Sequence, residues 1–126
     1  MDNTLEQVQE HLKKYKGAFI NSSNTSYNMI SLICIDNSQI TIGLDRVWRI
    51  YSKSKLVFSS TSIRDEEEFQ SFLQNRKVTS IKINKITNDL IINLLDKIQI
   101  HLIAINVRDE NWHLDNKAHC IGGGLV

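Results

Sequence analysis

The chain carries one sequence pattern twice, and this repeat limits the folds that it can adopt. Residues 36–42 align with residues 96–102 without a gap, and an Asp, a Gln and an Ile are identical between them. After a four-residue insertion Trp48 aligns with Trp112, so the two tryptophans of the chain take equivalent places. Similarity by chance is the alternative, because three identities are few.

Each half of the repeat begins with an amphipathic segment, and residues 4–16 align with residues 64–76. In the first segment the apolar residues share one helical face, namely Leu5, Val8, Leu12 and Tyr15. Gly17 follows as a helix stop. The second helix is predicted over 65–76, with a cap at Thr61 or Ser62. Its predicted apolar face consists of Phe69, Phe72 and Leu73.

Short segments rich in β-branched residues, several with apolar and polar residues in alternation, follow each predicted helix and favour strands. They are 18–21, 27–35, 39–44, 47–51, 56–59, 78–87, 90–95, 98–107, 112–115 and 118–121. The connections are mostly short, which favours antiparallel pairing. A half of about 60 residues cannot bury a sheet face alone. We therefore expect one α+β domain over 1–126, with antiparallel sheet, two helices and two pseudo-equivalent halves, approximately 1–61 and 62–126, each a helix plus a β-meander.

Composition argues against several classes of partner. The chain has 15 basic and 14 acidic residues and a net charge of +1, without the basic excess typical of a nucleic-acid-binding protein. No apolar run approaches the roughly 20 residues that span a bilayer, so we expect no membrane association. The first six residues lack the features of a signal peptide, which predicts a cytoplasmic protein.

The histidines and cysteines do not have the spacing of a metal site. His11, His101, His113 and His119 occur without an H-x-x-x-H pattern, and Cys34 and Cys120 without C-x-x-C. We predict no metal, no cofactor and no catalytic residue, with the cysteines as buried thiols. The alternative is a Cys/His site, since a hairpin turn at residues 116–117 would place His113 opposite Cys120.

Two acidic spots are the most distinctive surface features. Residues 65–68 read Asp-Glu-Glu-Glu, and Asp109-Glu110 precedes Trp112. Such residues attract a basic partner, whereas the simpler interpretation of 65–68 is a solvated helix start. The predicted partner-binding residues are Glu66, Glu67, Asp109, Glu110 and Trp112. We expect Trp48 and Trp112 to be core anchors, with a binding hot spot as the alternative.

The C-terminal stretch resembles an uncharacterised family of small bacterial proteins. The resemblance rests on the motif in residues 110–114, Glu-x-Trp-x-Leu, and on the glycines at 122–124 after a short apolar strand. It covers about the last 50 residues well and implies no activity. As a small α+β protein, the chain also resembles immunity proteins of bacterial toxin systems. This likeness is an analogy of type and not a motif match.

These features favour a non-catalytic intracellular binding protein, and specifically an immunity protein that inhibits a cognate bacterial toxin by direct binding. The alternatives are a small-ligand-binding or sensor domain, with an apolar pocket between the halves near Trp48 or Trp112, and an enzyme that uses Cys120 and His113. The protein would act as a monomer or a homodimer.

Overall fold

The computed structural model describes residues 4–21, 25, 29–44, 47–60, 65–84, 86–87, 89–103, 110–114 and 120–122. For 4–8, 44, 110–114 and 120–122 the description is of the backbone. The helices are α1 (Thr4–Lys13) and α2 (Glu66–Leu73). The strands are β1 (Phe19–Ile20), β2 (Met29–Ile33), β3 (Gln39–Leu44), β4 (Val47–Ser52), β5 (Lys55–Ser59), β6 (Val78–Ile83), β7 (Leu90–Leu94), β8 (Ile98–Ile103), β9 (Glu110–Leu114) and β10 (Cys120–Gly122).

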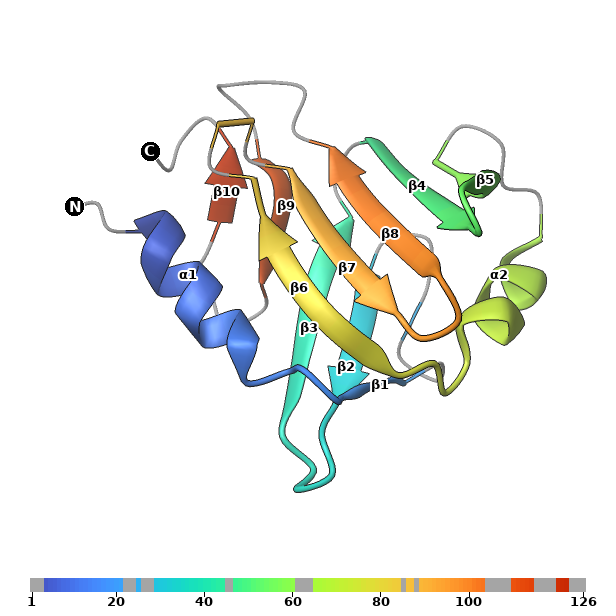
Figure 1. The fold of residues 1–126 in the computed structure, drawn as a ribbon, viewed down its shortest axis with the longest axis horizontal. Coiled ribbons are helices and arrows are strands. Elements are labelled where there is room, and N and C mark those ends of the chain that lie inside the picture. Colours follow the sequence, from blue (N-terminus) through green and yellow to red (C-terminus); the bar gives the residue numbers. More distant parts are fainter. Residues whose placement is uncertain are drawn as a thin grey trace.

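The strands form two antiparallel sheets, seen one behind the other in Figure 1. The first sheet has the order β1-β2-β3-β9-β10, and the second has the order β5-β4-β8-β7-β6. The prediction of an α+β fold with antiparallel sheets and two helices is therefore confirmed. The prediction of a meander within each half is wrong, because β3 pairs with β9 and β4 pairs with β8. Each sheet thus contains strands from both 1–61 and 62–126.

Backbone hydrogen bonds also join the two sheets at one edge. The N–H of Gly17 donates to the carbonyl of Val78 at 2.8 Å, and the N–H of Val78 donates to the carbonyl of Ala18 at 2.8 Å. Phe19 forms an antiparallel bridge with Lys77 beside these bonds. Gly17 has a φ of 89°, which L-residues with a Cβ rarely adopt. This glycine ends the turn after α1 and lets the chain enter the sheet.

Helix α1 covers the remaining edge of β6. The side chain of Gln9 donates to the carbonyl of Ile81 and accepts from the N–H of Ile83, both at 2.9 Å. An amide side chain thereby takes the place of a neighbouring strand and satisfies two edge groups. Leu12 and Tyr15 of the predicted apolar face are buried, whereas the side chains of Leu5 and Val8 lie outside the described part of the chain.

The core lies between the two sheets and beneath both helices. Alternate residues of β3 and β8 face inward, as the burial of Ile40, Ile42, Ile100 and Leu102 shows. These residues belong to one buried cluster with Phe69 of α2 and Leu12 of α1. Burial of each such side chain contributes about 1.5–3 kcal/mol relative to exposure. Isoleucine suits these positions because its branched side chain packs well on a pleated surface.

Candidate functional site

The first turn of α2 presents consecutive carboxylates to solvent. The carboxylate of Asp65 is the helix cap and accepts from the N–H groups of Glu67 at 3.0 Å and Glu68 at 3.2 Å. The predicted caps at residues 61 and 62 are therefore wrong: Asp65 reaches two unpaired N–H groups that any cap must satisfy. Glu66, Glu67 and Glu68 are exposed and complement the helix dipole.

A cluster of aromatic rings fixes α2 to the second sheet. Phe69 is fully buried, and its ring centroid lies 5.2 Å from that of Trp48 and 5.8 Å from that of Phe58. Phe72 adds a contact with Phe58 at 5.2 Å. Trp48 is only 3 % exposed, so the prediction that it is a core anchor is confirmed. The acidic turn consequently projects from a helix with little freedom to tilt.

The second predicted contact region lies in the first sheet. Glu110 begins β9, and Trp112 pairs with Leu44 of β3 and with Ile121 of β10. The register also places His113 opposite Cys120, as the predicted hairpin requires. The side chains of these residues lie outside the described part of the chain, as does Asp109 entirely.

The structure does not bring the two acidic regions together. In Figure 1, α2 lies at the right end of the molecule, whereas β9 and β10 lie toward the left. The turn with Glu66 and Glu67 therefore lies far from the strand that contains Glu110 and Trp112 (Figure 1). A partner would have to be large to touch both.

A groove of about 520 Å³ lies where two hairpin turns meet at the end of the second sheet, and we call it the polar groove after the hydrogen-bonded side chains along it. Its lining also includes the apolar residues Leu94, Leu95 and Ile98. The turn after β4 and the turn after β7 are joined by a bond from the N–H of Lys53 to the carbonyl of Lys97, at 2.9 Å. Four residues in these turns have left-handed backbones: Lys53 (φ 52°), Ser54 (φ 71°), Asp96 (φ 69°) and Lys97 (φ 62°). Each costs roughly 1–2 kcal/mol in a residue with a Cβ, and such strain gathers at binding sites.

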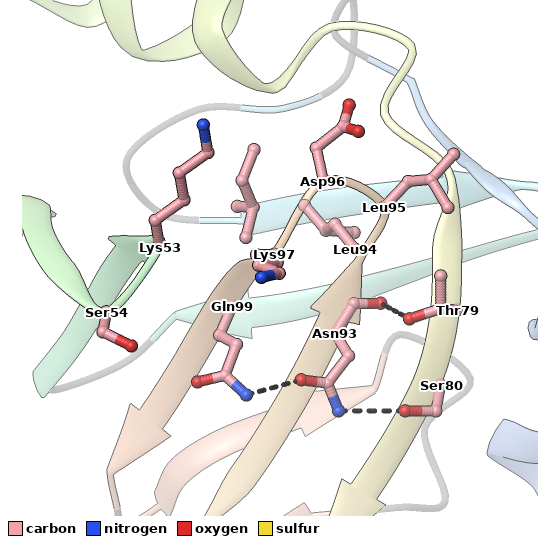
Figure 2. A pocket seen from close by; sticks show the side chains of 11 residues that line it. Lys53, Ser54, Thr79, Ser80, Asn93, Leu94, Leu95, Asp96, Lys97 and Gln99 are labelled. Carbon is pink, nitrogen blue, oxygen red and sulfur yellow. Dashed lines mark hydrogen bonds between the residues drawn. The ribbon is translucent and has the colours of Figure 1, made fainter.

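A row of hydrogen-bonded side chains borders this groove (Figure 2). The amide of Gln99 donates to Asn93 Oδ1 at 2.8 Å, and the amide of Asn93 donates to Ser80 Oγ at 2.9 Å. His101 Nε2 lies 3.0 Å from Gln99 Oε1. Because that oxygen can only accept, the ring nitrogen must donate. The row therefore crosses β8, β7 and β6 with its donors aligned in one direction.

Burial disfavours the charged forms of His101 and Cys34. Burial lowers the pKa of His101; Asp89 partly opposes this effect and Arg49 adds to it. His101 also meets the ring of Tyr51 edge-on at 4.8 Å. Burial raises the pKa of Cys34, the neighbouring carboxylate of Asp36 adds to this, and Lys14 opposes it. The Cys34 thiol is half-buried and free, so it is a weak nucleophile.

Within the described ranges, no three His, Cys, Asp or Glu side chains are grouped as metal ligands. None of the helices described is long and apolar enough to cross a membrane. No family model, curated protein or solved structure matches the chain. The family resemblance of the C-terminal stretch remains a prediction.

Sequence reasoning missed the polar groove. Its polar lining comes from residues 53–54, 79–80, 93, 96–97 and 99, which are far apart in the chain. In each strand these residues have the pattern of an ordinary solvent face. A usable signal is the lack of glycine in the turns at 53–54 and 96–97, where hairpins favour Asn-Gly or Asp-Gly.

Proposed function

We propose that this protein is a non-catalytic binding protein that recognises a basic surface on another protein. The acidic first turn of α2 carries the proposal. Glu66, Glu67 and Glu68 are exposed side by side, and the cap role belongs to Asp65. The exposed carboxylates of Glu67 and Glu68 are not required for helix capping, so a partner can reach them.

The position of this turn suits recognition of a charged partner. Phe69 and Leu73 are fully buried one turn and two turns along the helix, so the helix backbone that carries the carboxylates needs little further ordering on binding. Clustered charges act over about 8 Å at physiological ionic strength. They raise the association rate with a basic partner and disfavour acidic competitors.

The sharper form of the proposal is an immunity protein that covers the active site of a bacterial toxin. Its support is the acidic surface together with the likeness in size and style to immunity proteins, which is an analogy. Enzymes that act on nucleic acids carry basic active-site clefts, and an acidic turn is suited to enter such a cleft. Glu110, Asp109 and Trp112 would belong to a second contact region of the same partner.

Co-expression tests this proposal directly. The products of genes adjacent to the one encoding this chain are expressed with it and alone, and growth and complex formation are measured. Rescue of growth with a stable complex supports an immunity role. A complex without rescue supports binding but refutes inhibition, and no complex with any adjacent product refutes the immunity proposal.

The alternative of an apolar ligand pocket at Trp48 receives no support from its packing. Trp48 contacts Phe69 and is nearly fully buried. The described residues at the junction of the sheets, such as Ala18 and Val78, also belong to the packed core. The Cys120 and His113 alternative is favoured only by the backbone register.

We also propose that the two halves are equivalent, as the sequence repeat predicts. One helix followed by five strands occurs twice in the element order. Read from β6, the second sheet has the order β6-β7-β8-β4-β5. This order matches β1-β2-β3-β9-β10 when each strand is replaced by its counterpart in the other half, from β1 with β6 to β5 with β10. The last two strands of each half would then pair within the sheet that contains the first three strands of the other half. This arrangement supports a duplication in which neither half has a complete sheet.

A further inference from the structure

The polar groove has more hydrogen-bond donors than its internal bonds use. The amide nitrogens of Gln99 and Asn93 each carry two N–H groups, and the row of bonds uses one of each. Ser80 Oγ accepts from Asn93, so its own O–H points elsewhere. The oxygens of both amides accept one bond each and keep a second acceptor site. One N–H of Gln99, one N–H of Asn93 and the O–H of Ser80 therefore remain as donors for a ligand.

The charges at the groove favour an anion over a cation at one end. Lys97 adds an ammonium group beside the row, whereas the side chains of Lys53 and Asp96 extend toward the other end of the groove (Figure 2). The opposite charges of Lys53 and Asp96 offset one another there. The end next to Gln99, Asn93 and Ser80 therefore combines neutral donors with one cation.

The backbone holds these groups in place. Asn93 and Gln99 are paired residues of β7 and β8, and Ser80 is paired with Asn93 from β6. Thr79 Oγ1 also donates to the carbonyl of Asn93 at 3.1 Å. The backbone of Lys97 is held by the bond that its carbonyl accepts from Lys53. The amide donors fixed in this way lose little freedom when a ligand binds, whereas the exposed side chain of Lys97 becomes ordered on binding.

We propose that this groove binds a small molecule through a phosphate or carboxylate group. The oxyanion would accept hydrogen bonds from the amides of Gln99 and Asn93 and a charge-assisted bond from Lys97. The groove volume of about 520 Å³ falls in the range of small-molecule sites, so the rest of the ligand would extend toward Lys53. This site is separate from the acidic turn of α2 and does not depend on the proposed protein partner.

Nuclear magnetic resonance of the full chain tests the proposal with two probes, inorganic phosphate and succinate. The side-chain amide signals of Asn93 and Gln99 are followed while each anion replaces chloride at constant ionic strength and pH. We expect saturable shifts of both signals with at least one anion. Phosphate alone identifies the group as phosphate, and succinate alone identifies it as carboxylate.

Matched variants distinguish anion binding in the groove from nonspecific attraction of anions to exposed lysines. Lys97→Gln should weaken binding about tenfold, the loss expected for one charge-assisted bond. Lys55→Gln, at an exposed position outside the groove, should leave binding unchanged. The amide of Gln39, which is exposed on β3, serves as the internal control. The proposal is overturned by shifts that do not saturate, by equal shifts at Gln39, or by Lys97→Gln binding as tightly as the native chain.

Discussion

The aromatic contacts of Phe69 give the strongest test of how α2 is held. Phe69→Ala removes a fully buried ring that contacts Trp48 and Phe58. Such a truncation costs about 3–5 kcal/mol through lost burial and the cavity left behind. Of this, each ring pair contributes about 0.5–1.5 kcal/mol. Phe69→Leu keeps most of the apolar volume, so its expected cost is about 1–3 kcal/mol.

Urea unfolding followed by circular dichroism measures these changes, with the free energy extrapolated to water. A domain of this size has a total stability of about 5–15 kcal/mol, so Phe69→Ala should move the midpoint clearly. Ser71→Ala, at an exposed position on the same helix, is the control and should change stability by less than about 0.5 kcal/mol. A cost below about 1 kcal/mol for Phe69→Ala would contradict the packing described here.

Three further predictions concern the sheet edge, acid stability and the halves. Gln9→Leu should cost about 1–3 kcal/mol and speed hydrogen exchange at the N–H of Ile83, which loses its acceptor. Because the folded pKa of His101 lies below its ordinary value of 6.5, the unfolded chain binds its proton first. Stability should therefore fall as pH drops through about 6.5, and His101→Gln should reduce that fall. Fragments 1–61 and 62–126 should each be unfolded alone and regain β-sheet circular dichroism when mixed, whereas a fragment that folds alone would contradict shared sheets.

The strands of this fold could be predicted because local alternation marks them. Burial at Ile40 and Ile42 and at Ile98, Ile100 and Leu102 follows the alternation in the sequence. Strand pairing could not be predicted in the same way. The pattern of β3 and β4 is the same whether the strands form a hairpin or cross to different sheets. That choice depends on packing between residues far apart in the chain.

Local alternatives limited other predictions. Several residues between 61 and 65 can cap a helix, and only the geometry at Asp65 distinguishes them. The predicted helix over 4–16 ends at Lys13 because the chain continues in tighter turns, with Tyr15 N–H bonded to Leu12. The polar groove could not be predicted because its residues come together only when β6, β7 and β8 pair.

The association rate with a partner identified by the co-expression experiment tests the proposed recognition through α2 most directly. A triple variant with Glu66→Gln, Glu67→Gln and Glu68→Gln removes the acidic surface and keeps Asp65 as the cap. We predict an association rate about tenfold lower at low ionic strength, with the difference shrinking as salt is added. Glu10→Gln, an exposed acidic residue of α1, is the matched control and should have little effect. An unchanged rate in the triple variant, or an equal loss in Glu10→Gln, would contradict recognition through α2.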